Sequence, residues 1–307
     1  MKPLAIVYFI LVGFLLLPAP VATAPPRADA FDPAWAAYSL WDDGQAEVAL
    51  YEARRPQYGK IESYEAVFIV VKEDFNPRLN VKADPPYENK KLLPVLKLNA
   101  IHSYWTDNYP YHYLLSVFVR RDDPASLVKL TLGSQEWCGN TFKEVSTAGG
   151  RAELHFHSYF DAEGDSARAL ELRPGDLLED QLALVLRGLR FAPGLELHRR
   201  ILPTLISNKL GPASVFLDAT IKVIGDEGLV QSVPCPAGTG GASGMCVSHY
   251  EAWKIQVKFG EIRQTWWFEK AAPHTLLKME SSDGRAWVLK ARTRKPYWQA
   301  PTFKPAM

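Results

Sequence analysis

The sequence lacks the short motifs that usually identify an enzyme. It contains no glycine-rich phosphate loop, no nucleophile elbow and no zinc-binding helix of the HExxH type. No internal repeat is evident either. No residue is therefore marked as catalytic by its motif, and the sequence predicts no cofactor.

An excess of charge of one sign is also missing. The 307 residues include 35 Lys and Arg against 34 Asp and Glu, which gives a formal net charge of +1. Proteins that bind nucleic acids normally show a clustered basic surplus, because phosphate neutralisation dominates their affinity. Paired arginines such as Arg54-Arg55 and Arg199-Arg200 are isolated and are typical of solvated strand ends. We therefore expect no nucleic-acid partner.

Cysteine is limited to three residues. Cys235 and Cys246 bracket a glycine-rich segment with few side chains that could pack. We expect a disulfide between them, which would stabilise the fold by about 3 kcal/mol, mainly by restricting the unfolded chain. Cys138 is then left over. Free cysteines are among the most often buried residues, so we expect Cys138 in the core, with a nucleophile as the alternative.

The longest hydrophobic run lies at the N-terminus, where apolar residues fill positions 4–17 after a single lysine. This run is shorter than the roughly 20 residues that a membrane-spanning helix needs. It predicts a secretory signal peptide over residues 1–30. Cleavage after Ala24 or after Ala30 fits the small-residue rule, and we favour Ala30, which makes Phe31 the mature N-terminus. The mature protein is then expected in the periplasm or outside the cell.

Alternation of apolar and polar residues recurs along most of the remaining chain, with turn residues between the segments. It predicts one β-rich domain over residues 31–307, with a subdivision near residue 170 as the alternative. The expected fold is mainly β, a large curved antiparallel sheet that resembles a half-barrel or barrel. The predicted strands are 46–53, 63–72, 95–104, 112–120, 127–132, 151–160, 215–224, 250–259, 264–269, 276–281 and 285–291.

One segment departs from the β pattern. Pro174-Gly175-Asp176 precedes a run of leucines with helical spacing, and Gly188 follows it. These signals predict a short helix over 177–189. Its apolar face needs cover, so we expect the helix to pack in the concavity of the sheet.

The second half of the chain carries a resemblance to a known family. Its features are the leucine-rich helix, the strand pair 219–223 and 253–257, the tryptophan-containing strand 265–268 and a closing hairpin with Gly284 at its turn. In this order they resemble a family of bacterial envelope proteins known only as a domain of unknown function. The resemblance implies a curved sheet with a helix in its concavity, similar in outline to bacterial lipoprotein carriers.

The first half, with Trp41-Asp42-Asp43-Gly44 and the segment 134–141, resembles secreted proteins that carry provisional names. Some of those names mention an inhibitor of septum formation, a nucleotide-pyrophosphatase family. The chain lacks the N-terminal Ser-Arg-rich loop of that family, so we do not expect its chemistry here.

Two histidines share one face of a predicted strand. In the segment 151–160, alternation places His155, His157 and Tyr159 on the same face. Two such histidines could bind one zinc ion together with a third ligand from another strand. Histidines on the solvated face of a strand are more common, and that is the arrangement we expect.

Aromatic residues are plentiful, and alternation sends Trp266 and Trp267 to opposite faces of their strand. At least one of these rings needs cover outside the main core, which a ligand cleft would provide. We therefore expect an apolar or amphipathic ligand, a lipid or a cell-wall component, inside the curved sheet. The candidate ligand-binding residues are Trp137, Tyr159, Leu184, Trp266 and Trp267.

Two other functions remain open. One is an extracytoplasmic hydrolase that uses Cys138 or a metal site at His155 and His157. The other is a structural or assembly partner in the envelope. The sequence predicts no oligomeric state.

Overall fold

A computed structural model describes residues 30–210, 215–235 and 244–299 of the chain. Its strands form one sheet of 16 strands, in the order β10-β11-β12-β13-β14-β15-β16-β1-β2-β4-β5-β6-β7-β8-β9, with β3 beside the end of β2. Neighbouring strands pair antiparallel, except β10 and β11, which are parallel. The predicted mainly β fold is thus confirmed, and the sheet is open rather than closed.

The described elements follow the chain in this order. They are α1 (Pro33–Ala36), the 3₁₀ turn η1 (Ser39–Asp42), β1 (Ala46–Gln57), β2 (Lys60–Asn76), β3 (Val81–Lys82), β4 (Leu93–Trp105), β5 (Pro110–Arg120), β6 (Leu127–Glu136), β7 (Gly139–Ser146), η2 (Ala148–Gly150), β8 (Ala152–His157), β9 (Asp165–Leu170), β10 (Leu177–Leu178), η3 (Glu179–Gln181), α2 (Leu182–Val185), η4 (Leu186–Gly188), β11 (Glu196–Leu202), β12 (Leu217–Pro234), β13 (Met245–Phe259), β14 (Ile262–Glu269), β15 (Leu276–Ser281) and β16 (Ala286–Lys295).

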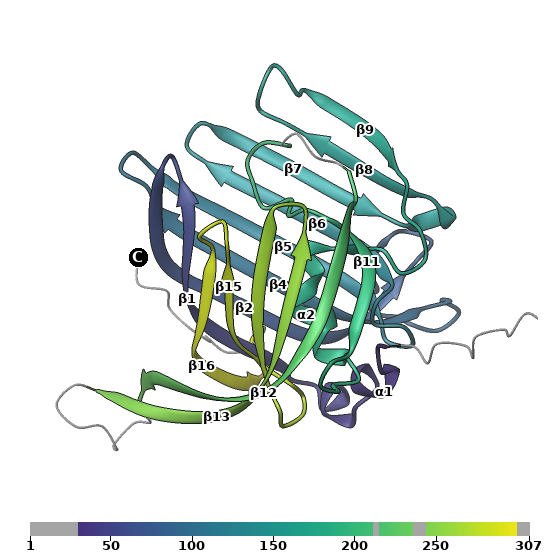
Figure 1. The fold of residues 1–307 in the computed structure, drawn as a ribbon. Coiled ribbons are helices and arrows are strands. Elements are labelled where there is room, and N and C mark those ends of the chain that lie inside the picture. Colours follow the sequence, from purple (N-terminus) through teal and green to yellow (C-terminus); the bar gives the residue numbers. More distant parts are fainter. Residues whose placement is uncertain (1–29, 211–214, 236–243, 300–307) are drawn as a thin grey trace, which may run out of the picture.

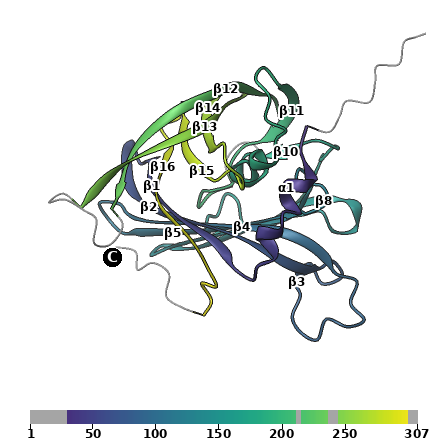
Figure 2. The ribbon, with the colours of Figure 1, turned by 90° about the horizontal axis from the view of Figure 1, so that it is seen from below.

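The sheet folds over itself to form two layers. Strands β11 to β16 arch over β1 to β5, as the view from below shows (Figure 2). The layers are joined by the antiparallel pairing of β1 with β16. Register shifts interrupt the ladders at Leu50/Tyr51 in β1, at Val223/Gly225 in β12 and at Trp267/Phe268 in β14. Such bulges bend a strand and increase its twist, which favours the curvature seen here.

The predicted helix over 177–189 is a more irregular element. Leu177 and Leu178 form the short strand β10, and the helical stretch η3-α2-η4 follows over 179–188. Every residue from 177 to 189 is buried, and the stretch lies between the two layers (Figure 2). A helix that is covered all round belongs to the core rather than to a surface face.

The alternation pattern located the long strands but missed five others, of which β3 and β10 have only two residues each. The strands β7, β9 and β11 were not predicted, because each is short or carries consecutive polar residues, as in His198-Arg199-Arg200 of β11. The strand expected over 151–160 ends at His157. The chain then turns through residues 158–164, where Gly164 has a positive φ.

A buried ion pair fastens the helical stretch to the sheet. Arg187 and Glu47 form two hydrogen bonds of 2.8 Å each, and Arg187 is only 2 % exposed. The Arg187 Nε atom also donates to the carbonyl of Pro273, and its guanidinium lies over the rings of Trp35 and Trp41. This cluster connects η4 with α1, β1 and the β14–β15 loop.

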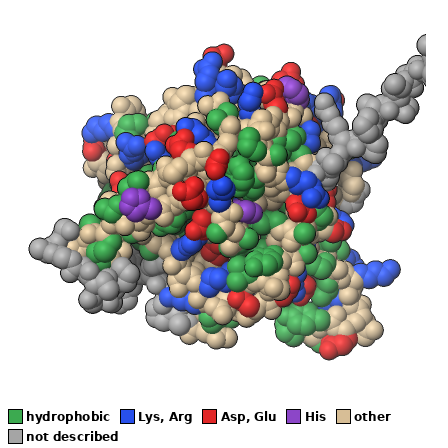
Figure 3. All heavy atoms as spheres, turned by 60° about the horizontal axis from the view of Figure 1, so that its bottom comes forward, with side chains coloured by type: hydrophobic (Ala, Val, Ile, Leu, Met, Phe, Trp, Pro, Cys, Tyr) green, Lys and Arg blue, Asp and Glu red, His purple; other side chains and the backbone are tan. Residues whose placement is uncertain are grey.

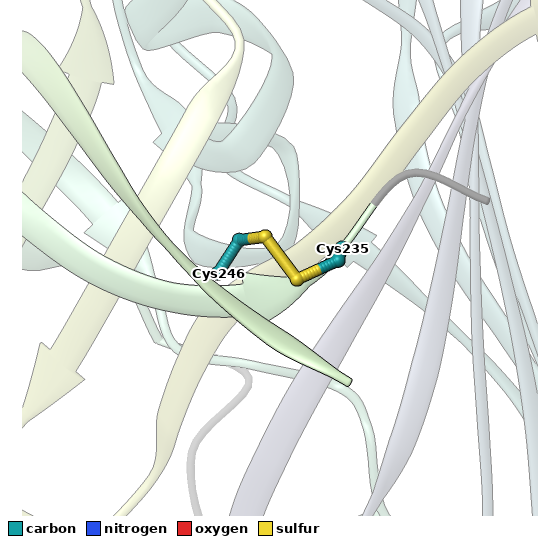
Figure 4. Close-up of a disulfide and its surroundings, with 2 residues drawn as sticks. All are labelled: Cys235 and Cys246. Carbon is teal, nitrogen blue, oxygen red and sulfur yellow. A yellow bond between two sulfur atoms is a disulfide. The ribbon is translucent and has the colours of Figure 1, made fainter. Parts of the chain in front are cut away.

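The predicted disulfide is confirmed: Cys235 and Cys246 are bonded near the far end of the β12–β13 hairpin (Figure 4). The prediction that Cys138 is buried is wrong. Cys138 lies exposed in the turn between β6 and β7, where Glu136 pairs with Gly139 and leaves only Trp137 and Cys138 between them. A two-residue hairpin turn holds its side chains outside the core.

Two further observations concern the surface and the membrane. Acidic and basic side chains are interspersed on the face shown in Figure 3. None of the described helices is long and apolar enough to cross a membrane.

The expected signal peptide lies outside the described residues except for Ala30, whose carbonyl accepts a hydrogen bond from the Arg190 backbone N–H at 2.9 Å.

Candidate ligand-binding site

A cavity of about 220 Å³ lies between the helical stretch and the two layers of the sheet. Exposed Pro56 and partly exposed Asp283 belong to its lining, so the cavity reaches the surface near the β1–β2 and β15–β16 turns. Its apolar lining includes Phe68, Leu98, Leu115, Ala183, Trp266 and Trp287.

Three aromatic rings form one wall of this cavity. The ring centroids of Phe68 and Trp287 lie 5.0 Å apart at an interplanar angle of 73°, and those of Trp266 and Trp287 lie 5.8 Å apart at 71°. Edge-to-face packing of this kind is favourable for aromatic pairs. The three rings come from β2, β14 and β16, so the wall joins both layers.

Glu179 connects the polar side of the cavity to this wall. Its carboxylate accepts hydrogen bonds from the backbone N–H of Thr204 at 2.8 Å and from Gln264 Nε2 at 2.7 Å, and it pairs with Arg285 at 2.6 Å. Gln264 in turn accepts a hydrogen bond from Trp266 Nε1 at 3.1 Å. Glu179 is therefore a structural junction that holds Arg285 and Trp266 in position.

Asp180 binds the segment 203–210, which follows β11 and is called here the strap. Its carboxylate accepts hydrogen bonds from the Thr204 hydroxyl and from the Leu205 backbone N–H. Burial and the neighbouring Glu179 charge raise the pKa of Asp180 to about 6, although these two hydrogen bonds act in the opposite direction. The charge on the cavity wall therefore changes close to pH 6.

Lys143 of β7 holds the strap from the other side. Its ammonium group is fully buried and donates to the carbonyls of Leu205, Ser207 and Lys209. Burial lowers the pKa of Lys143 to about 8. The strap, which contributes Thr204 and Ile206 to the cavity lining, is thus fixed by side chains on two sides.

His102 of β4 is the most deeply buried titratable group on the cavity wall, with 1 % of its surface exposed. Burial, assisted by the positive charges of Arg55 and Arg285, lowers its pKa to about 3, so the ring is neutral at physiological pH. The Tyr64 hydroxyl lies 2.9 Å from His102 Nδ1. The His102 Nε2 atom is buried and has no hydrogen-bond partner among the described residues.

Arg55 of β1 lies beside His102 on the same cavity. One of its terminal nitrogens donates to the carbonyl of Ile206 in the strap, and its guanidinium lies over the rings of Tyr104 and Tyr113. Its Nε atom is buried without a partner in the described part of the chain. A buried polar atom that is left unpaired costs free energy, so a ligand that pairs with Arg55 Nε and His102 Nε2 would remove this cost.

Of the five predicted ligand-binding residues, the structure places one at the cavity. Trp266 lines it. Leu184 is fully buried in the core but is not part of the lining, which its neighbour Ala183 joins instead. Trp267 lies on the opposite face of β14, beside Lys254 and Lys278. The other two candidates, Trp137 and Tyr159, are exposed on the turns after β6 and β8.

The candidates for a hydrolase are not brought together. His155 pairs with Glu153, and His157 lies 3.4 Å from Asp165 on the exposed face of β8. Cys138 lies at the tip of the β6–β7 hairpin. In the part of the chain that the structure describes, no group of three or more His, Cys, Asp or Glu side chains could hold a metal ion.

Sequence reasoning missed His102, Arg55, Asp180 and Arg285. A signal for one of them was available, because Arg55 shares the inward parity of Tyr51 and Ala53 along β1. The sequence pattern of the pair Arg54-Arg55 indicates a solvated strand end instead.

No family model, curated protein or solved structure matches the chain. The resemblance of its two halves to envelope and secreted proteins therefore stays a prediction.

Proposed function

We propose that this protein is an exported binding protein that holds a small amphipathic molecule in the cavity between its helical stretch and its sheet. The cavity itself carries this proposal. It combines an aromatic wall of Phe68, Trp266 and Trp287 with a polar side that includes His102 and Arg55. Pockets for small molecules typically join a mostly apolar lining with a few placed polar groups.

The size of the cavity restricts the ligand. A volume of about 220 Å³ exceeds the roughly 150 Å³ of a cavity that holds benzene, and it is below the roughly 300–1,000 Å³ of pockets for drug-sized molecules. The expected occupant is one ring with a short side arm. A lipid or a cell-wall component would enter with only part of its structure.

Export is supported by the N-terminal apolar run and by the disulfide between Cys235 and Cys246. Disulfides persist mainly in oxidising compartments such as the periplasm and the extracellular space. The hydrogen bond to the Ala30 carbonyl favours cleavage after Ala24 over cleavage after Ala30, because only the first would keep Ala30 in the mature chain.

A calorimetric titration with indole and with 2-phenylethanol tests the proposal. We expect wild-type protein to bind at least one of these ring-sized probes. Ala183→Leu should abolish this binding, because the larger side chain fills the cavity, while Ala169→Leu on the exposed surface of β9 serves as the matched control. Binding of neither probe, or equal binding by Ala183→Leu, would contradict the proposal.

One observation favours the assembly partner as a second candidate function. The β12–β13 hairpin extends away from the body of the sheet (Figure 1) and exposes Val230, Met245 and Val247 along one face. Exposed apolar stripes are typical of contact surfaces. A second copy of the chain is the occupant to test, by sedimentation of wild type against Val230→Ser with Val247→Ser. A monomer in both samples would contradict this candidate.

A further inference from the structure

We propose that the ligand of this cavity is a small aromatic carboxylate, whose anionic head is bound by the Nε–H groups of Arg55 and His102. This inference rests on the proposed binding function and assigns the chemical class of the ligand. It starts from two buried nitrogens that have no hydrogen-bond partner within residues 30–210, 215–235 and 244–299, Arg55 Nε and His102 Nε2.

The tautomer of His102 determines what its free nitrogen can bind. An ionised carboxylate has no proton to donate, so a bound carboxylate selects the His102 tautomer that carries its proton on Nε2 and accepts at Nδ1. The Tyr64 proton is then available for His102 Nδ1, 2.9 Å away. A neutral imidazole that accepts at Nδ1 carries its proton on Nε2. With Tyr64 as the donor to Nδ1, His102 Nε2 is a hydrogen-bond donor for the ligand.

The second unpaired nitrogen is a donor in any state, because arginine stays protonated and its guanidinium has no acceptor atom. Arg285, the other arginine on the cavity lining, is paired with the carboxylates of Glu179 and Asp283. The described partners of Arg55 are a backbone carbonyl and two tyrosine rings, all of them uncharged. A ligand that supplies acceptors and a negative charge satisfies both nitrogens and the Arg55 charge.

A carboxylate fits these requirements better than a neutral acceptor does. Its two oxygens can each take one donor, and hydrogen bonds between charged groups are about twice as strong as neutral ones. Burial of an anion is costly unless it is paired and hydrogen-bonded, which Arg55 and His102 together provide. The ring of such a ligand would pack against the aromatic wall of Phe68, Trp266 and Trp287.

Three matched probes separate the head group from the ring: phenylacetate, 2-phenylethanol and 2-phenylethylamine. We expect wild type to bind phenylacetate at least about tenfold more tightly than 2-phenylethanol and to bind the amine most weakly. Arg55→Met should remove the preference for phenylacetate. Arg54→Met, one residue away on the exposed face of β1, should keep it.

The affinities for phenylacetate and 2-phenylethanol are compared within each variant. A general loss of stability therefore does not change their ratio. His102→Phe should reduce the preference as well, because it removes the Nε2 donor and keeps an aromatic ring. Binding of 2-phenylethanol as tight as that of phenylacetate, or tightest binding of the amine, would overturn the inference and leave the proposed function standing. Binding of none of the three probes would overturn the inference, and if indole also fails to bind, the proposed function is overturned as well.

Discussion

The hydroxyl of Tyr64 lies 2.9 Å from Nδ1 of His102, and this contact occupies one ring nitrogen of the buried histidine in the cavity wall. When Tyr64 donates in this contact, the ring proton is on Nε2, the nitrogen that has no protein partner among the described residues. The free site can therefore donate a hydrogen bond at neutral pH, and the first prediction concerns this state.

We expect the His102 ring to be neutral, with its proton on Nε2, at every pH from 5 to 8. Burial lowers its pKa to about 3, far below the ordinary value of 6.5. The ring nitrogens can be followed by ¹⁵N NMR, with His102→Gln to assign the signals. A signal of His102 that changes to the imidazolium form near pH 6 would contradict this description of the site.

The buried pair of Arg187 and Glu47 should be essential for stability. Removing one member leaves an uncompensated buried charge, which typically costs about 3–5 kcal/mol. We expect Arg187→Met to lower the free energy of unfolding by this amount, measured by urea denaturation. Arg187→Met combined with Glu47→Gln should recover part of the loss. A single variant with wild-type stability would show that the pair does not fasten the helical stretch.

Asp180 should make the protein less stable as the pH rises through its titration range. Its pKa is raised from 3.8 in the unfolded chain to about 6 in the folded protein. The folded state therefore binds more protons than the unfolded state between about pH 4 and pH 6, and stability falls by up to about 3 kcal/mol over this window.

Replacement of Asp180 tests whether its titration makes the protein less stable as the pH rises. The charged groups that act on it are Glu179, Arg285 and Lys143, and Asp180→Asn keeps all three. We expect the slope of the unfolding free energy between pH 4 and pH 6 to be more positive in the variant than in wild type. Identical slopes would mean that Asp180 titrates normally.

Cys138 should react quickly with a thiol reagent in the native protein, because it lies exposed at the tip of the β6–β7 hairpin. Cys235 and Cys246 should react only after reduction, since they form the disulfide. Mass spectrometry after alkylation counts the labels. One label without reductant and three with it are expected, and Cys138→Ser should remove the first. No label in native wild type would place Cys138 in the core.

The sequence was sufficient for the parts of the fold that depend on local pattern. Alternation located strands such as β4 and predicted opposite faces for Trp266 and Trp267, and the spacing of Cys235 and Cys246 predicted their bond. It also predicted that residues 177–189 pack inside the sheet. Each of these features follows from neighbouring residues alone.

The candidate site was not predictable in the same way. Arg55, His102, Asp180 and Arg285 come from β1, β4, η3 and the β15–β16 turn. These segments meet only when β16 pairs with β1 and the helical stretch enters between the layers. No local sequence pattern indicates that β16 pairs with β1. The sequence predicts Leu184 at the cavity, but the irregular helical stretch presents its neighbour Ala183 instead. An error of one residue therefore changes which side chain faces the cavity.

Native mass spectrometry tests the central claim most directly. The protein and its Ala183→Leu variant would be purified from the cells that make the protein, under conditions that retain bound molecules. We expect wild type to carry one small molecule of constant mass and Ala183→Leu to carry none, because its cavity is filled. Wild type and variant that each show only the mass of the bare chain would contradict the claim that this cavity binds a ligand.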